Sequence, residues 1–299
     1  MRNRTSKSKL VSRATPYLFL SPTLIVIIVL LVVPICLVVK YSFFNNAIVV
    51  KNPTLVGLAN YVRILTDNEF GLAIKNTLFF VIVSVVAHIV LGMCFALLLN
   101  TKYFKTRTKT IARVIYVLPW VFTASVIAIL WKLMLQPQGI VNYLLSFVNL
   151  ATKDTEWLSS MSVALATITF VNIWCGYPFY MISILAGLQG ISGDLYESCA
   201  LDGANSWKSF LHITLPQLKP ILISITMLDF IWTLQSFAVI WMMTGGGPVN
   251  TTETLSIYIY KLAFNQSQYA LASTSAVIAL VFCILVSVFY VRQQKKASE

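Results

Sequence analysis

The sequence predicts an all-α polytopic membrane protein with six transmembrane helices, and three observations carry this prediction. Of the 299 residues, 58% are apolar and 11% are charged, whereas about a quarter of a soluble domain is charged. Six apolar stretches reach the length of about 20 residues that a helix needs to cross a bilayer. The net charge of +12 comes from short basic runs between these stretches, which favours a membrane protein over one that binds nucleic acid.

The predicted spans follow one another through most of the chain. Basic residues precede the first span as in a signal peptide, but its apolar core is too long and no small-x-small cleavage site follows. We therefore expect a retained helix, a tail over 1–16 before it, a six-helix domain over 17–291 and a tail over 292–299. The six spans are predicted at 17–39, 76–99, 111–135, 161–188, 221–243 and 270–291.

The distribution of positive charge orients the helices. Most of the 22 Lys and Arg residues lie in the two tails and in the second and fourth connections. Because connections rich in Lys and Arg remain in the cytoplasm, both termini and the fourth connection, 189–220, are expected to be cytoplasmic. The connections at 40–75 and 244–269 are then expected outside, in a multi-pass protein surrounded by lipid.

No pattern in the sequence indicates a metal site or a catalytic centre. Four of the five cysteines fall inside apolar stretches, where Cys behaves as a small hydrophobe. None lies at metal-ligand spacing from another, and the chain has neither a His-Glu-x-x-His nor a Gly-x-x-x-x-Gly-Lys-Ser/Thr motif. We expect no disulfide, no metal, no cofactor and no enzyme activity.

The cytoplasmic connection at 189–220 has the signals of two short helices. Asp194 and Glu197 have the spacing of a capping box, and Gly203 is the residue type that commonly follows a helix end. Asn205 or Ser206 can cap a second helix. The prolines at 216 and 220 are expected to end that second helix before the fifth span.

One face of the first short helix carries small side chains. Tyr196, Cys199, Ala200 and Gly203 are spaced i, i+3, i+4 and i+7, so they share a face that another surface can approach closely. Bulky apolar residues follow within a few positions. This pattern fits a loop that docks on another protein, and it equally fits a loop that packs only on its own helices.

These residues resemble a known family. Residues 196–204, Tyr-Glu-Ser-Cys-Ala-Leu-Asp-Gly-Ala, followed by 213–216, Ile-Thr-Leu-Pro, resemble the EAA loop of binding-protein-dependent ATP-binding-cassette importers. That loop has Glu-Ala-Ala, then Gly four residues on, then Ile-x-Leu-Pro about nine residues later. The chain departs from it at Ser198 and Cys199, which replace alanines but are also small, so the close-approach face is kept.

Two further segments narrow the resemblance to carbohydrate importers. Residues 243–248, Met-Thr-Gly-Gly-Gly-Pro, with 252–255, Thr-Glu-Thr-Leu, and 258–264 resemble the loop after the fifth span of sugar-importer permeases. Residues 56–61, Val-Gly-Leu-Ala-Asn-Tyr, resemble an external element of maltose-type and glycerol-phosphate-type permeases. The likeness covers most of 17–291 and implies the type I importer permease fold with EAA-type coupling helices, closest in pattern to the maltose-type first permease.

The resemblance also implies partners and a place in the cell. It implies a separate ATP-binding-cassette ATPase dimer, a second permease subunit, an extracytoplasmic solute-binding protein and a sugar substrate, in the cell membrane of a prokaryote. The loop would pass the closure of the ATPase to the membrane helices. The residues that it assigns to ATPase coupling are Glu197, Ser198, Cys199, Ala200, Asp202, Gly203, Trp207, Phe210, Leu215 and Pro216.

Polar residues in the fifth span are candidates for the substrate pathway, because such residues inside a membrane commonly mark function. Asp229, Trp232, Thr233 and Ser236 are spaced for one helix face. A carboxylate and hydroxyls suit the OH groups of a sugar, and an indole suits its apolar ring face. The corresponding stretch lines the transport cavity in maltose-type permeases. The alternative is that the four residues pack helix against helix, with Asp229 paired to a neighbour.

The fourth span offers facing partners in Asn172 and Tyr177. His88 in the second span has no acidic neighbour at helical spacing, and we expect it to be a packing histidine. An ion-gradient-driven secondary transporter is the alternative function, but it predicts inverted repeats and several buried charges. The sequence has no evident repeat and one clear intramembrane acid.

Overall fold

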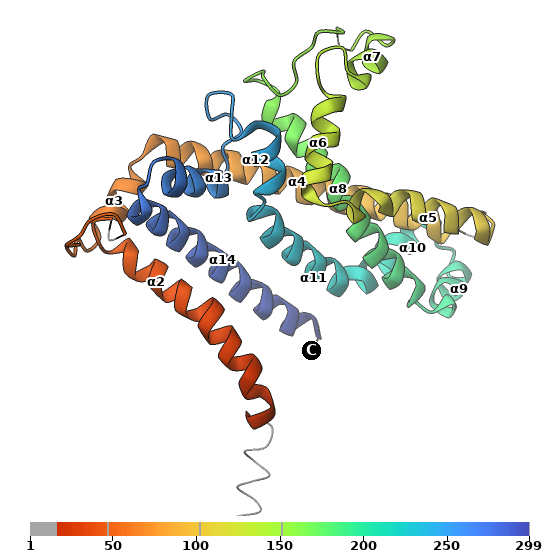
Figure 1. Cartoon of the computed structure of the whole chain (residues 1–299). Helices are drawn as coiled ribbons and strands as arrows, with labels where there is room; N and C mark the ends of the chain where they lie inside the picture. The colour runs from red at the N-terminus through yellow and green to blue at the C-terminus, as the bar shows by residue number, and fades with distance from the viewer. Residues whose placement is uncertain (1–16, 47, 102, 151, 299) are drawn as a thin grey trace, which may run out of the picture. The chain divides into compact units, whose positions relative to one another are not determined.

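The computed structural model describes residues 17–46, 48–101, 103–150 and 152–298, and the predicted basic tail over 1–16 lies outside these residues. Every regular element in the described ranges is a helix (Figure 1). The elements are η1 (Ile28–Val32), α2 (Val33–Ser42), α3 (Ala59–Leu65), α4 (Asn68–Asn100), α5 (Thr106–Val121), α6 (Ala124–Met134), α7 (Ile140–Ser146), α8 (Ala164–Gln189), α9 (Gly193–Leu201), α10 (Ser206–Ser209), η2 (Phe210–Thr214), α11 (Leu215–Leu234), α12 (Ala238–Thr244), α13 (Leu255–Tyr260), η3 (Lys261–Asn265) and α14 (Tyr269–Ser298).

The prediction of six spans is confirmed, with one span in two pieces. The helices long and apolar enough to cross a membrane are Tyr17–Ser42, Asn68–Asn100, Ala164–Gln189, Ser206–Leu234 and Tyr269–Arg292. The sixth consists of α5 and α6, which meet at a bend of 97°. Thr123 is extended at the bend, and its side chain accepts a hydrogen bond from the amide of Val126, which starts α6 anew. The span predicted at 111–135 is therefore not one straight helix.

The chain forms two compact units, and the first contains α2, α3 and the start of α14. It comprises the described residues of Met1–Leu65 together with Lys261–Ala279. Gly57 has φ +57° in the turn ahead of α3, a backbone conformation that glycine adopts readily. The side-chain amide of Asn60 donates to the carbonyls of Ser42 and Phe44 at 2.9 and 3.0 Å. The hydroxyls of Tyr61 and Ser42 are 2.7 Å apart, so α3 is tied to the end of α2.

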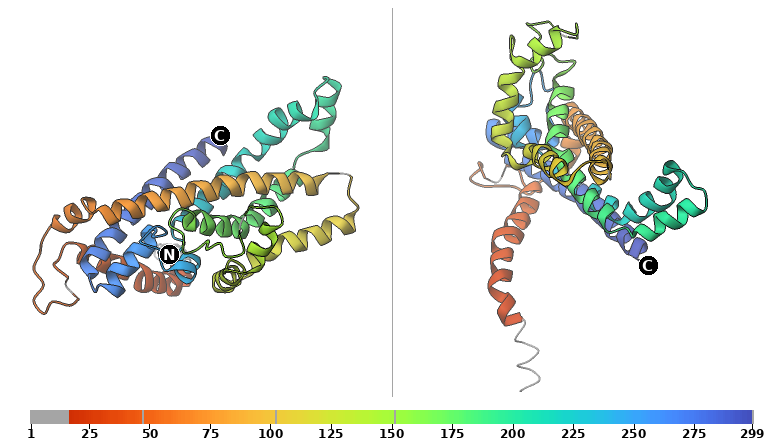
Figure 2. Two further views of the ribbon diagram at one scale, coloured as in Figure 1. Left: turned by 90° about the horizontal axis from the view of Figure 1, so that it is seen from above. Right: turned by 90° about the vertical axis from the view of Figure 1, so that its right-hand side faces the viewer.

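The second unit comprises Thr66–Tyr260 with the described residues of Leu280–Glu299, and α4 and α8 form its centre. The two helices run side by side (Figure 2). Gly92 on α4 faces Tyr180 on α8 so closely that a Cβ at Gly92 would collide with the Tyr180 Cβ. Small residues permit such close backbone approach between membrane helices. Because the side chains of Tyr180 and Met181 are fully buried, this contact holds α4 and α8 as one layer.

The helix that enters the fifth span differs from prediction. The prolines at 216 and 220 were expected to end a short helix, but Ser206–Leu234 is continuous through α10, η2 and α11 (Figure 1). The wider π turn of η2, in which the amide of Leu215 donates to the carbonyl of Phe210, lies directly before Pro216. A widened turn can absorb a proline that lacks an N–H group. The span predicted at 221–243 is instead interrupted after Leu234 and resumes as α12.

Candidate functional site

A cavity of about 180 Å³ lies among α4, the end of α5, α8 and α11 in the second unit. Its wall combines aromatic rings with groups that form hydrogen bonds, which is the usual composition of a small-molecule site. The residues that line it are His88, Trp120, Asn172, Cys175, Gly176, Phe179, Asp229, Trp232, Thr233 and Ser236.

Asp229 forms hydrogen bonds with three side chains on three helices. Its Oδ2 lies 2.8 Å from Nδ1 of His88 on α4. The hydroxyl of Tyr180 on α8 donates to the same oxygen at 3.1 Å, and the Thr233 hydroxyl donates to Oδ1 at 3.1 Å. The Asp229 and His88 residues are 7% and 1% exposed. A buried carboxylate needs such partners, because an isolated charge is strongly disfavoured away from water.

His88 faces acceptors on both sides of its ring. Its Nε2 lies 3.1 Å from the backbone carbonyl of Asn172, and a carbonyl can only accept, so Nε2 carries a proton. Nδ1 and the Asp229 carboxylate share another proton, which makes the pair neutral overall wherever that proton sits. Gly176 makes room for the ring, because a Cβ there would collide with Cε1 and Nε2 of His88.

The prediction that His88 is an isolated packing histidine is wrong. Its partner lies 141 residues away in the sequence, beyond the reach of any helical spacing. A signal was nevertheless available. His88 and Asp229 each stand alone as ionisable residues in otherwise apolar spans, and buried charges are found in pairs.

The structure brings most of the predicted substrate-pathway residues together. Asp229, Trp232, Thr233, Ser236 and Asn172 all line the cavity. The single helix face predicted for the four residues of the fifth span does not include Ser236, because α11 ends at Leu234 and Ser236 follows in the interruption. The alternative prediction, that Asp229 is paired to a neighbour, is confirmed by its hydrogen bond to His88.

Tyr177 lies elsewhere. Its hydroxyl donates to the carbonyl of Tyr116 at 3.3 Å, and its ring packs on Phe95 at a centroid distance of 5.1 Å. No spacing pattern in the sequence predicted the aromatic lining that comes from outside the fifth span. The Phe179 ring lies 5.5 Å from that of Trp232 and 6.0 Å from that of Trp120, so three rings form a continuous aromatic row.

One group in the cavity wall has its hydrogen-bonding capacity unused. The side-chain nitrogen of Asn172 is buried and, among the described residues, has no partner. An unsatisfied buried amide is unfavourable by about 1–3 kcal/mol. In the described ranges no group of three or more His, Cys, Asp or Glu side chains is placed to hold a metal ion. The free amide of Asn172 and the row of aromatic rings are suited to binding a polar ligand by hydrogen bonds and stacking.

The connection between α8 and α11 contains the two predicted short helices. The cap of α9 differs from prediction: the Ser192 hydroxyl accepts from the amide of Asp194, so Asp194 lies in the first turn and the Asp194–Glu197 capping box is wrong. Gly203 has φ +74° and ends α9 as predicted. Asn205 caps α10 as predicted, since its side-chain oxygen accepts from the amide of Lys208 at 2.9 Å.

The small face of α9 packs on the following helix of the same chain. The hydroxyl of Tyr196 lies 2.9 Å from that of Thr214, and Cys199 Sγ lies 3.5 Å from the Ser209 hydroxyl. A groove of about 800 Å³ separates α9 and α10 from the end of α4, and Ala200 lines it. Of the ten predicted coupling residues, Cys199 and Phe210 are partly buried; the exposed ones are Glu197, Ser198, Ala200, Asp202, Gly203, Trp207, Leu215 and Pro216.

Part of the surface of this connection is exposed to solvent. Leu201 is 89% exposed and Trp207 is 66% exposed. A Cβ at Gly203 would meet nothing within 4 Å. The connection thus packs partly on its own helices and presents apolar side chains on its free side, which is typical of a protein interface.

The loop after α12 is anchored at the opposite end of α4. The side-chain amide of Asn76 donates to the carbonyls of Asn250 and Glu253 at 3.1 and 3.0 Å. The hydroxyl of Tyr258 donates to Asp67 Oδ2 at 2.7 Å. Burial and this hydrogen bond raise the pKa of Tyr258, so the hydroxyl keeps its proton. Asn76 and Asn100 are separated by about 36 Å along α4, at 1.5 Å per residue, so this loop and the α9–α10 region lie about one bilayer thickness apart.

The chain is similar to proteins of known transport systems in sequence and in fold. The chain is 32% identical over 291 residues to the trehalose/maltose transport system permease protein MalF of Thermococcus litoralis, covering 97% of both chains. It is 32% identical over 286 residues to the lactose transport system permease protein LacF of Rhizobium radiobacter, covering 94% of both. The crystal structure of a bacterial ABC transporter involved in the import of the acidic polysaccharide alginate has a chain that matches with a TM-score of 0.84 and 24% identity, covering 98% of this chain and 100% of that one.

The match to the alginate transporter chain shows the fold, which is the predicted type I importer permease fold. Residues 88–299 match the family described as the binding-protein-dependent transport system inner membrane component. Its members are transport subunits, which agrees with the permease prediction and gives no support to an ion-gradient-driven transporter. The chain belongs to this family of membrane components of binding-protein-dependent transport systems.

Proposed function

We propose that this chain forms half of the translocation pathway for a carbohydrate in an ATP-driven importer. The observation that carries the proposal is the continuous helix Ser206–Leu234. Near one end it presents the exposed ring of Trp207, and near the other it places Asp229 and Trp232 in the cavity wall. Trp207 and Asp229 are about 33 Å apart along the helix axis. This one helix therefore joins the exposed surface of the α8–α11 connection to the cavity.

The cavity supplies groups that a sugar requires. The exposed face of Trp232 and the neighbouring rings can stack on the apolar face of a pyranose. The unused amide of Asn172 and the hydroxyl of Ser236 can bond to its OH groups. Asp229 already forms three hydrogen bonds, so its main effect is to hold its neighbours in place. Relatives named for the transport of trehalose, maltose and lactose support the choice of carbohydrate.

In this proposal the exposed surface of α9 and α10 binds an ATPase subunit. Its apolar residues, Leu201 and Trp207, would enter a groove on that subunit, and Gly203 would allow close backbone approach. This surface would face the cytoplasm together with both termini. A second permease subunit would complete the pathway. A solute-binding protein would dock on the opposite side, and a solved alginate transporter in complex with its periplasmic protein offers a parallel.

Uptake by cells that express the chain with its neighbouring genes tests the proposal. Radiolabelled maltose, trehalose and lactose should accumulate only when an ATPase gene and a binding-protein gene are present. Uptake should stop when ATP is depleted and should continue when ion gradients are collapsed at constant ATP. Uptake that follows the ion gradient and ignores ATP would contradict it.

A further inference from the structure

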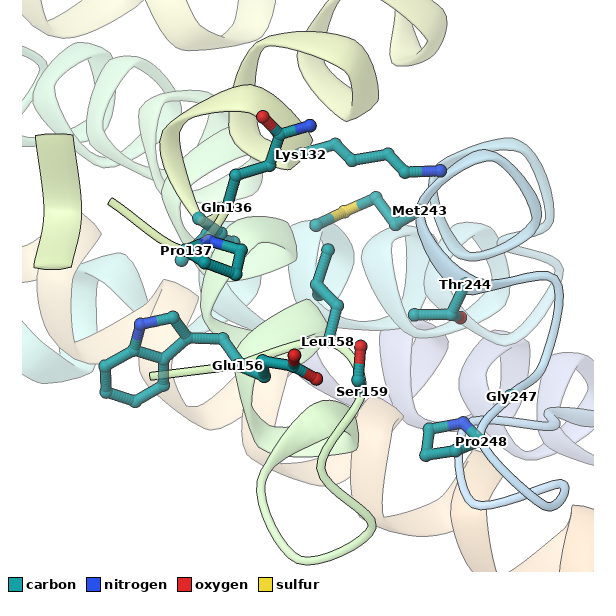
Figure 3. Close-up of a pocket in the computed structure, with 12 residues that line it drawn as sticks. Lys132, Gln136, Pro137, Glu156, Leu158, Ser159, Met243, Thr244, Gly247 and Pro248 are labelled. Carbon is teal, nitrogen blue, oxygen red and sulfur yellow. The ribbon is translucent and has the colours of Figure 1, made fainter. Parts of the chain in front are cut away.

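A second and larger cavity lies near the loop that follows α12. It has a volume of about 410 Å³, and its lining comes from the end of α6 and the residues after it, from residues 156–159, and from the end of α12 and the loop that follows (Figure 3). Figure 3 shows the Lys132 side chain extending from α6 toward α12, with Glu156 and Ser159 on the same side of the cavity as Leu158. All of these residues belong to the second unit.

The two cavities lie at opposite ends of one pair of helices. α6 and α12 pack against each other. α6 begins just after Trp120 of the first cavity and carries Lys132 of the second near its end. α12 begins just after Ser236 and ends at Thr244. The seven residues of α12 span about 10 Å, so the two cavities are separated by a short distance along this helix.

The chemistry of the second cavity suits a neutral polyhydroxylated ligand. Lys132 can donate hydrogen bonds and Glu156 can accept them. Within the described part of the chain, neither residue forms an ion pair, and both are exposed toward solvent. Pro137, Leu158 and Pro248 add apolar surface between these polar groups. Alternating polar and apolar contacts match the OH groups and the C–H faces of a sugar ring.

We propose that this cavity is an outer saccharide site, which receives the sugar before it moves to the His88–Asp229 cavity. The opposite charges of Lys132 and Glu156 leave the site without net charge, so it favours a neutral saccharide over an acidic one. The proposal rests on the proposed function, because it requires that the cargo is a carbohydrate.

Protection from alkylation tests occupancy directly. Ser159→Cys places a thiol in the cavity wall, and Ser162→Cys, on the same segment but outside the lining, is the matched control. Intact cells that express the full set of subunits are treated with a membrane-impermeant maleimide. An excess of free maltose, trehalose or lactose should slow labelling of the S159C variant and leave that of S162C unchanged. If the imported sugar gives no protection at S159C, the outer site is wrong.

Uptake kinetics give a second readout. Lys132→Met removes a charged donor, and Glu156→Gln replaces a charged acceptor by a neutral one. Each should raise the sugar-loaded binding-protein concentration for half-maximal uptake about tenfold. Lys153→Met and Asp154→Asn carry the same changes on exposed residues outside the cavity and should have no effect. Equal kinetics in all four variants would refute the site.

A parallel binding measurement separates the outer site from a protein-docking surface. The affinity of a fluorescently labelled binding protein for the reconstituted importer should be the same in K132M, E156Q and the unsubstituted protein. If both substitutions weaken docking as much as they weaken uptake, the cavity is a contact for the binding protein and the saccharide proposal is overturned. If the unsubstituted importer carries no saccharide at all, the proposed function has failed, and the outer site fails with it.

Discussion

Nδ1 of His88 lies 2.8 Å from Oδ2 of Asp229, although 141 residues separate the two in the chain. The pair joins α4 to the helix that continues from α10, and Tyr180 adds α8 to the junction. Polar groups inside a membrane are unfavourable unless they are paired. Three helices are therefore held at one point in the wall of the cavity.

The first prediction concerns this pair. Asp229→Ala and His88→Ala should each lower stability by about 3–5 kcal/mol, since each leaves a buried polar partner alone. The double variant should lose less stability than the sum of the two single losses, because neither member of the His88–Asp229 pair is then buried without the other. Unfolding midpoints of the protein in nanodiscs measure the effect. Ser224→Ala, on the same helix but outside the cavity, is the control, and strictly additive losses would contradict the coupling.

Gly176 provides a second test that leaves both charged residues in place. A Cβ at this position collides with the His88 ring, so Gly176→Ala should displace the ring and lower stability by about 1–3 kcal/mol, as overpacking does. Gly71→Ala is the matched control, because its Cβ would meet nothing within 4 Å. That change should be neutral or slightly stabilising. Equal thermal stability of the two variants would show that His88 does not need its observed position.

The third prediction concerns Gly203, which has φ +74° at the exit from α9. Gly203→Val should strain this turn by about 1–3 kcal/mol and add bulk to the proposed ATPase contact. The variant should still reach the membrane but should fail to co-purify with the ATPase. Gly193→Ala is the control, because its Cβ would meet nothing and its φ is not positive. Normal co-purification of the G203V variant would remove this turn from the interface.

The fourth prediction concerns the aromatic row. Trp232→Ala should raise the half-saturation constant for sugar uptake about tenfold, which corresponds to a stacking loss of about 1–1.5 kcal/mol. Trp232→Phe keeps an aromatic face against Phe179 and should recover most of the affinity. Uptake measured over a range of concentrations of sugar-loaded binding protein gives the half-saturation constant of each variant. An alanine variant with the kinetics of the phenylalanine variant would exclude stacking at this position.

Features that depend on local chemistry could be predicted from the sequence. Apolar length locates the spans, and the end of α9 at Gly203 and the cap at Asn205 follow from side chains within a few residues. Prediction failed where contacts between residues far apart in the sequence, or local changes in backbone geometry, determine the structure. The π turn before Pro216 let a helix continue that proline normally ends.

The candidate site shows the same division. The polar stripe at Asp229, Trp232 and Thr233 could be found from its spacing, and the cavity contains all three. The partner on α4 and the ring of Phe179 come from helices whose packing no spacing rule describes. Tyr177 was misplaced for this reason: its side chain points toward Tyr116 and away from the cavity.

The unbroken helix Ser206–Leu234 has a mechanical consequence. If Ser206–Leu234 moves as one body, a rotation of about 10° at Trp207 displaces Asp229 by about 6 Å over the roughly 33 Å between them. That displacement is twice the length of a hydrogen bond. Such a displacement would separate the Asp229 carboxylate from the His88 imidazole and so change the shape of the cavity that both residues line.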